Sequence, residues 1–309
     1  MIKNKNILIF GKRGFIGSHF YNTIKKNNNV YSFFSNNKKI DLNNYHKKKI
    51  DDIINKNKFD FILNFHAQTD LKFSNKNPNY DFYHNCSIVH SIVNAMINNS
   101  CKAFFLNFGT VTQIGYTNIK KKIKLNITSK PQSIFDLHKQ YSENYISIQK
   151  TENNLNATTL RLSNVFGLGK THSKNRGVIS QIIDNALLNK KIILFGNGNY
   201  FRDFIYINDV IKGIILALKN YNNLKDNYYY LTSGRRNTFN QLAKFIKQEI
   251  YMRYKYKVNI EYKNWPKNSS MLDKRSFVGN PQSFIKATGW KSSFVLKDAI
   301  SHYIYKKKR

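Results

Sequence analysis

The segment Gly11-Lys12-Arg13-Gly14-Phe15-Ile16-Gly17 directly follows the apolar run Ile7-Leu8-Ile9-Phe10. We expect a strand over 6–10, a tight turn, and a helix over 15–27. In this context the first glycine permits the turn, the second lets the backbone approach a pyrophosphate, and the third allows close packing of the helix on the strand. The pyrophosphate would lie on the helix N-terminus. The segment therefore predicts a dinucleotide site made by Gly11, Arg13, Gly14, Phe15, Ile16 and Gly17.

Strand-like and helix-like segments alternate through the first two-thirds of the chain. This alternation is typical of an α/β fold with a Rossmann-type, doubly wound parallel sheet, which binds ligands at the carboxyl ends of its strands. The expected strands cover 6–10, 30–34, 59–65, 103–108 and 157–162, and the expected helices cover 15–27, 43–56, 78–99 and 134–152.

The rest of the chain predicts further helices near 176–189, 208–220, 238–250 and 295–305, and strands near 191–195, 228–231 and 257–262. A chain of 309 residues suits one large domain or two closely joined lobes. We expect a dinucleotide-binding domain and a smaller, mostly C-terminal, substrate-binding lobe. The first comprises 1–164 and 201–233, and the second comprises 165–200 and 234–309.

The chain has a formal net charge of +34 at pH 7, which is typical of nucleic-acid-binding proteins. Asparagine, isoleucine, tyrosine and phenylalanine are abundant together with lysine, however, and all five residues have codons rich in A and T. A nucleic-acid binder would enrich only the basic residues. We therefore expect no specific nucleic-acid partner, although the charge favours anionic ligands.

Composition also limits the compartment and the cofactors. Hydrophobic residues make up 41% of the chain, which is typical of a globular protein. We find no signal-peptide pattern and no apolar run of the roughly 20 residues that a membrane span needs. Cys86 and Cys101 lack metal-site spacing, and the histidines are scattered. These features predict a cytoplasmic protein without a membrane segment or a metal.

Four later segments carry further sequence motifs besides the glycine turn. They are DFILNFHAQT at 60–69, FGTVTQIG at 108–115, LRLSNVFG at 160–167, and 195–210, which contains the run RDFIYINDV. In order and spacing they are similar to motifs of the extended short-chain dehydrogenase/reductases of the NAD-dependent epimerase/dehydratase family, and Asn85 matches a structural asparagine of that family. The resemblance covers nearly the whole chain.

The resemblance implies an NAD(P)-dependent enzyme that transfers hydride at a carbon of a nucleotide sugar, in a pathway that makes surface-polysaccharide precursors. It implies that Phe65, His66 and Ala67 lie against the cofactor, and that the Thr110 hydroxyl binds the reacting oxygen. Substrate contacts would come from Thr110, Asn164, Arg202 and Arg275. Members of the family commonly form homodimers, here through the helices near 78–99 and 134–152. Ile88, Ile92, Val93 and Met96 could supply one apolar face, although burial against the chain's own sheet would give the same pattern.

The chain departs from the family at the catalytic pair Tyr-x-x-x-Lys. Lys139 is in place as the lysine that holds the ribose, but the tyrosine position holds Phe135. A phenyl ring can neither donate nor accept a proton. Thr110 with a water, His138 or Tyr141 could substitute for the tyrosine, although helix geometry directs His138 and Tyr141 to other sides of the helix. Alternatively, the protein could be a weakened relative that only binds cofactor and nucleotide sugar.

The residues after the expected second strand bear on cofactor choice. NAD-preferring relatives carry an acidic residue there, whereas this chain has Ser35, Lys38 and Lys39, with Arg13 nearby. These groups favour NADP over NAD, and Asp41-Leu42 resembles the adenine-contacting pair of the family. The run Thr110-Val111-Thr112 lacks the two carboxylates of the family's sugar dehydratases, so an epimerase or a 4-keto-reductase remains.

Overall fold

A six-stranded, all-parallel sheet forms the centre of the protein in the computed structural model, with strand order β10-β5-β4-β3-β1-β2. The structure describes residues 2–33, 44–115, 122–123, 127–169, 177–267, 269 and 271–307. Ser35, Lys38, Lys39, Asp41 and Leu42 lie outside these residues. The strands are β1 (Asn6–Phe10), β2 (Asn29–Phe33), β3 (Phe61–Asn64), β4 (Phe104–Thr110), β5 (Ala157–Leu162) and β10 (Tyr228–Leu231).

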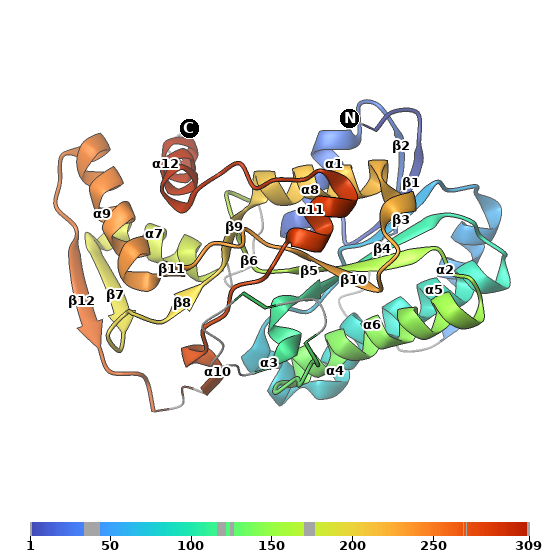
Figure 1. Ribbon diagram of the computed structural model, residues 1–309, viewed down its shortest axis with the longest axis horizontal. Helices are drawn as coiled ribbons and strands as arrows, with labels where there is room; N and C mark the ends of the chain where they lie inside the picture. The colour runs from blue at the N-terminus through green and yellow to red at the C-terminus, as the bar shows by residue number, and fades with distance from the viewer. Residues whose placement is uncertain are drawn as a thin grey trace.

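The central strands are buried on both faces, and alternate side chains enter two separate cores. In β1, Ile7 and Ile9 belong to one core, whereas Leu8 and Phe10 belong to the other. This alternation follows from the two-residue period of a strand. Helices α1 (Phe15–Ile24) and α8 (Ile207–Lys219) cover one face, and α2 (Asn44–Lys56), α5 (Ile88–Asn98) and α6 (Ile134–Glu152) cover the other (Figure 1).

A smaller group of elements lies beside the central sheet (Figure 1). Its strands form three pairs: β7 (Lys191–Phe195) with β12 (Asn259–Lys263), β6 (Asn164–Phe166) with β9 (Phe204–Tyr206), and β8 (Phe201–Arg202) with β11 (Asn237–Thr238). Because β6 begins directly after β5 ends, this group starts at the carboxyl ends of the central strands. Its main helices are α7 (Val178–Asn189), α9 (Phe239–Tyr254) and α12 (Leu296–Lys307).

Short elements that the sequence did not indicate complete the fold. The helix expected over 78–99 is α4 (Pro78–Phe82), a π-helical turn η1 (Tyr83–Ser87) and α5. Further short elements are α3 (Leu71–Lys76), α10 (Met271–Lys274), α11 (Gln282–Thr288), and the 3-10 turns η2 (Val111–Ile114) and η3 (Tyr221–Asn223).

The apolar residues expected to form a dimer interface on α5 are instead buried within the chain. These four residues are at most 6% exposed: Ile88, Ile92, Val93 and Met96. Their side chains pack against the central sheet and against Ile50 and Ile54 of α2, because the apolar stripe of α5 faces the sheet. The predicted dimer face on α5 is therefore wrong.

Candidate active site

The glycine turn between β1 and α1 has the close packing that its sequence predicts. Gly11 has φ +78°, and a Cβ there would lie 2.5 Å from the backbone nitrogen of His66. A Cβ on Gly17 would lie 2.4 Å from the Gly11 carbonyl oxygen. Gly14 is the N-cap of α1, and it has no side chain to cap the helix. The first N–H groups of α1 therefore point towards a position where an anion can bind.

The end of β3 lies directly against this turn. The Phe65 ring stacks on Phe108 at the end of β4, with ring centroids 4.6 Å apart. The His66 backbone N–H donates to Asn64 Oδ1 at 3.2 Å, and His66 Nε2 lies 2.6 Å from His84 Nδ1. Burial lowers the pKa of His66 to about 3 and that of His84 to about 4, so both rings are neutral at pH 7. The segment with Phe65, His66 and Ala67 thus forms one wall beside the glycine turn.

Phe135 and Lys139 lie on one buried face of α6, one turn apart. The Lys139 ammonium donates to the Phe108 carbonyl oxygen at 3.1 Å, and burial lowers its pKa to about 8. Phe135 is 7% exposed. The position of the lysine is therefore compatible with a ribose contact, whereas the neighbouring position has no group that can carry a proton.

A chain of hydroxyl groups connects Thr110 to a buried carboxylate. Thr110 Oγ1 lies 2.9 Å from Thr112 Oγ1, and Thr112 Oγ1 donates to Asp136 Oδ1. Asp136 Oδ2 accepts hydrogen bonds from Ser133 Oγ at 2.8 Å and from the Arg275 guanidinium at 3.3 Å. Asp136 is fully buried. Thr112, Ser133 and Asp136 were not predicted as site residues from the sequence, although Ser-x-x-Asp at a helix start is a capping pattern.

Gln113 and a buried ion pair hold the Thr110 segment in place. Gln113 Oε1 accepts from the Thr110 backbone N–H at 2.7 Å, and Gln113 Nε2 donates to Glu143 Oε2 at 3.3 Å. Glu143 pairs with Arg161 through two hydrogen bonds, of 2.8 and 2.5 Å. The guanidinium of Arg161 lies 3.7 Å from the centroid of the Tyr228 ring. Removing one partner of such a buried pair typically costs about 3–5 kcal/mol, so this pair fixes α6 against β5.

His138 and Tyr141, two possible substitutes for the missing tyrosine, point away from Thr110. His138 Nδ1 lies 2.7 Å from Asp81 Oδ2, and the His138 ring contacts Phe82 edge-on. Tyr141 is 44% exposed, and its ring also lies beside Phe82. Because one helix position corresponds to about 100°, these side chains leave α6 in directions different from that of Phe135. Their proposed role at the Thr110 hydroxyl is therefore wrong.

Arg202 and Arg275 form a buried pair of cations. Both are at most 7% exposed, and their guanidinium carbons lie 5.3 and 5.9 Å from the centroid of the same ring, that of Phe277. Arg202 donates to the backbone carbonyls of Phe201 and Asp273, which do not neutralise its charge. Burial first, and then the charge of Arg275, lower the pKa of Arg202 to about 10. Arg275 also pairs with Asp136, so the two arginines together carry less net charge than two free cations, and they are a candidate site for an anion such as a phosphate.

Asn164 and Asp203 lie next to Arg202, with different functions. The Asn164 backbone N–H donates to the Asp203 carbonyl oxygen at 3.1 Å, which fixes β6 beside β9. The Asp203 carboxylate accepts from Ser163, Ser233, and the backbone N–H groups of Gly234 and Gly279. Asp203 therefore ties the loops together, and no hydrogen bond joins it to Arg202 among the contacts described.

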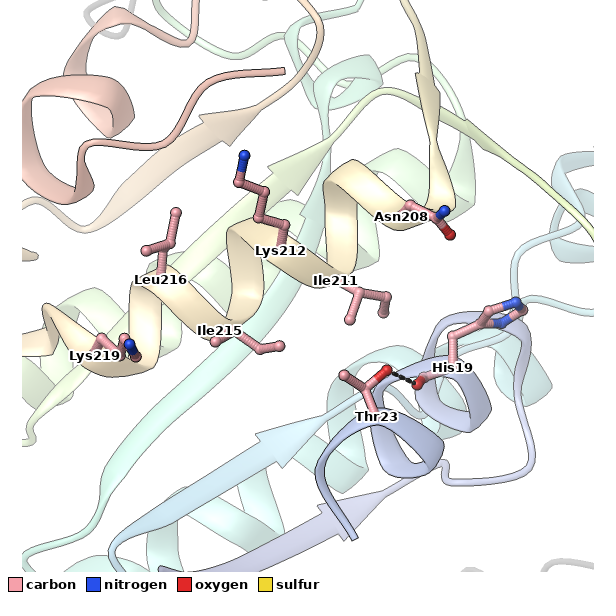
Figure 2. A pocket seen from close by; sticks show the side chains of 8 residues that line it. All are labelled: His19, Thr23, Asn208, Ile211, Lys212, Ile215, Leu216 and Lys219. Atoms are coloured by element: carbon pink, nitrogen blue, oxygen red, sulfur yellow. Dashed lines mark hydrogen bonds between the residues drawn. The ribbon is translucent and has the colours of Figure 1, made fainter. Parts of the chain in front are cut away.

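A hollow of about 420 Å³ lies between α1 and α8, away from the residues described so far (Figure 2). Ile211, Ile215 and Leu216 give it an apolar wall, and Lys212 and Lys219 stand at its edge. The Thr23 hydroxyl already donates to the His19 carbonyl oxygen at 2.8 Å (Figure 2). None of the eight described residues that line this hollow is a predicted site residue, so we place the active site elsewhere, at the strand ends.

No group of three or more His, Cys, Asp and Glu side chains in the described part of the chain could hold a metal ion. The described helices include none whose length and apolarity would allow it to cross a bilayer.

Residues 7–231 match the model of the NAD dependent epimerase/dehydratase family. The chain belongs to this family. A relative, a putative UDP-glucose 4-epimerase of Methanocaldococcus jannaschii, is 30% identical over 261 residues, which cover 80% of this chain and 83% of the relative. These matches confirm the predicted family, the α/β class and an NAD(P)-dependent nucleotide-sugar epimerase or reductase.

Solved structures agree on the fold. UDP-glucose 4-epimerase of Thermotoga maritima, solved with UDP-glucose, superposes with a TM-score of 0.82 at 24% identity, over 98% of this chain and 100% of that one. RMD of Pseudomonas aeruginosa, solved with NADPH, gives a TM-score of 0.79 at 16% identity, over 98% and 96%. The parallel sheet and the smaller group of elements are thus shared by these proteins.

Proposed function

We propose that the protein inverts a hydroxyl-bearing carbon of a nucleoside-diphosphate sugar, with the ring hydroxyl bound at Thr110. The observation that carries this proposal is the Arg202–Arg275 pair, which the Asp136 network connects to Thr110. A diphosphate at the two arginines would leave the attached sugar to extend towards Thr110. The similarity to UDP-glucose 4-epimerases supports the same substrate class.

Each predicted residue then has a task in the reaction. The glycine turn binds the pyrophosphate of the dinucleotide, and Lys139 holds its ribose. The nicotinamide supplies the chemistry of hydride acceptance and return when it is bound. Thr110 orients the reacting hydroxyl, Asn164 contacts phosphate or sugar hydroxyls, and Arg202 with Arg275 neutralises the substrate diphosphate. The buried Arg161–Glu143 pair holds α6 against β5, so the site is formed before substrate binds.

The test is product analysis together with a binding variant. The protein is incubated with NAD or NADP and a panel of UDP-, dTDP-, CDP- and ADP-hexoses, and inversion is followed by NMR. We expect Arg202→Leu to weaken UDP binding about 100-fold in calorimetry, because charge-assisted hydrogen bonds in a partly dry site contribute a few kcal/mol. Arg253→Leu, on the surface of α9, is the matched control. Equal UDP affinity in wild type and Arg202→Leu would contradict the assignment.

A preference for NADP over NAD is expected from the cations of the glycine turn and of the segment that follows β2 in the sequence. Arg13 is exposed in the glycine turn, and Ser35, Lys38 and Lys39 follow β2 in the sequence. A 2′-phosphate would bind these groups, whereas a 2′-hydroxyl gains little from them. We expect Arg13→Ala to weaken NADP binding about tenfold and NAD binding far less. Calorimetry with both dinucleotides measures this, and tighter binding of NAD by wild type would refute it.

A homodimer is expected through α6 rather than through the buried face of α5. Leu137, Tyr141 and Ile148 form an apolar stripe on α6 and are 49%, 44% and 55% exposed. Two copies of this stripe would pack around a twofold axis, the usual symmetry of dimers. The double variant Tyr141→Glu/Ile148→Glu is expected to be monomeric in light scattering at micromolar concentration. Leu188→Glu, at an exposed position on α7, should leave the mass unchanged, and a monomeric wild type would contradict the proposal.

With the domain boundaries expected above, Arg202 belongs to the dinucleotide-binding domain and Arg275 to the substrate-binding lobe, so the arginine pair would lie between the two. The free thiols of Cys86 and Cys101 suit the cytoplasm, where disulfides are rare. Phe135 favours one alternative, a relative that binds cofactor and nucleotide sugar but turns over slowly, and the same NMR assay distinguishes it from an active epimerase.

A further inference from the structure

The hydrogen bonds that connect Thr110 to Asp136 through Thr112 all run from donor to acceptor in the direction of Asp136. A threonine hydroxyl has a single proton. Thr112 donates its proton to Asp136 Oδ1, so the 2.9 Å contact between the two hydroxyls requires Thr110 to be the donor. The Thr110 oxygen also accepts from the Thr112 backbone N–H at 3.2 Å. Thr110 therefore keeps one lone pair, which can accept a hydrogen bond from a substrate hydroxyl.

Asp136 is arranged as an acceptor at the end of this chain. Its carboxylate accepts hydrogen bonds from Thr112, from Ser133 and from the Arg275 guanidinium. It is fully buried, and it lies one residue after Phe135, the position that lacks the hydroxyl. Asp136 thus follows the position of the missing tyrosine directly in sequence. The hydroxyl groups of Thr112 and Thr110 connect its carboxylate to the position of the reacting oxygen.

We propose that Asp136 is the proton acceptor of the reaction and acts through Thr112 and Thr110, in place of the absent tyrosine. The inference rests on the proposed function. As the sugar hydroxyl is oxidised to a ketone, its proton moves to Thr110, the Thr110 proton to Thr112, and the Thr112 proton to Asp136, so the carboxylate becomes a carboxylic acid. A bound dinucleotide would take up the hydride that leaves the sugar carbon. No water or external base enters the balance.

The burial of Asp136 favours epimerisation over net reduction. In an epimerase the proton returns along the same three groups when hydride adds to the other face of the ketone. Asp136, Thr112 and Thr110 then have the same protonation states as before the reaction. A reductase instead consumes one proton from solvent in each turnover, and a fully buried acid supplies it slowly. Arg275 couples the relay to substrate binding, because the same guanidinium contacts Asp136 and lies beside Arg202.

The test compares Asp136→Asn and Thr112→Val with wild type, using the nucleotide sugar that wild type converts fastest. Each variant is expected to lower kcat about 100-fold or more, the usual contribution of a proton-transfer group, with dinucleotide affinity unchanged. KM should stay unchanged in Thr112→Val, which keeps the contact between Asp136 and Arg275. Adding Phe135→Tyr to Asp136→Asn should restore at least about tenfold of kcat, because a phenol at that position bypasses the relay. Asp298→Asn, at an exposed position on α12, is the control for loss of a carboxylate.

The outcomes separate the relay from the proposed function. Loss of kcat in both variants supports the relay if Phe135→Tyr raises kcat by a larger factor in the Asp136→Asn background than in the wild-type background. A merely structural role of Asp136 would leave that factor the same in both backgrounds. Wild-type kcat in folded Asp136→Asn or in Thr112→Val overturns the relay and leaves the proposed function standing. A wild type that binds dinucleotide and UDP but converts no nucleotide sugar overturns both proposals.

Discussion

Substitution of Gly14 by Asp is expected to weaken dinucleotide binding at least about 100-fold while the fold is retained. Gly14 has φ −66° and ψ 168°, which any residue can adopt, and a Cβ there would lie 3.3 Å from the Gly11 carbonyl oxygen. Asp is moreover a favourable N-cap residue. Its carboxylate would bind the N–H groups of α1 that the pyrophosphate needs, and would repel the phosphates in a partly dry site. A loss of about 3 kcal/mol corresponds to this factor.

The matched control is Gly14→Asn, which has the same shape and a similar capping preference but no charge. Calorimetric titration with NAD and NADP should rank wild type above Gly14→Asn, and Gly14→Asn well above Gly14→Asp. Circular dichroism and thermal unfolding establish that both variants are folded. Wild-type affinity in a folded Gly14→Asp protein would mean that the dinucleotide does not bind at α1.

Lys139→Met is the second substitution with a large expected effect. Lys139 is buried, its ammonium lies at the carboxyl end of β4, and burial has lowered its pKa to about 8. Hydrogen bonds from a charged donor are worth about 1.5–3 kcal/mol, so losing the ribose contact should weaken dinucleotide binding roughly 10- to 100-fold. The same loss is expected with Phe135 or with Tyr at position 135, because the ribose contact does not need the phenol.

Lys150→Met removes a lysine from the far end of the same helix and serves as the control. Dinucleotide affinity is measured in four proteins: wild type, Lys139→Met, Phe135→Tyr, and the double variant. Phe135→Tyr alone should bind like wild type, since it adds one hydroxyl at a position that the family shapes for tyrosine. Unchanged affinity in Lys139→Met would show that α6 does not contact the cofactor.

Much of the fold could be predicted because its signals are local. The β1–α1 unit follows from an apolar run, three glycines and a helical pattern, and the structure gives Gly11 and Gly17 a steric reason. The central strands follow from short apolar segments. The π-helical turn at Tyr83–Ser87 could not be predicted, because one extra residue per turn leaves no mark in hydrophobic spacing.

The site was predicted less completely, because its most informative contacts are not local. Thr112 and Asp136 are 24 residues apart in sequence, and Arg275 is 139 residues from Asp136. Thr110 was expected from the resemblance, and Arg275 was expected as a second cation for the substrate's phosphates, but the carboxylate between them was not predicted. The apolar stripe of α5 was ambiguous for another reason: periodicity identifies a buried face but not what buries it.

The central claim is that this protein passes hydride between a nucleotide sugar and a bound nicotinamide although position 135 holds phenylalanine. A single-turnover experiment tests it most directly: wild-type protein saturated with oxidised NAD or NADP is mixed rapidly with UDP-glucose and the other nucleotide sugars of the panel, and the absorbance of reduced nicotinamide is recorded. The account predicts a transient reduced-nicotinamide signal with at least one sugar, followed by release of the inverted sugar. Binding of both ligands without that signal for any sugar would contradict it.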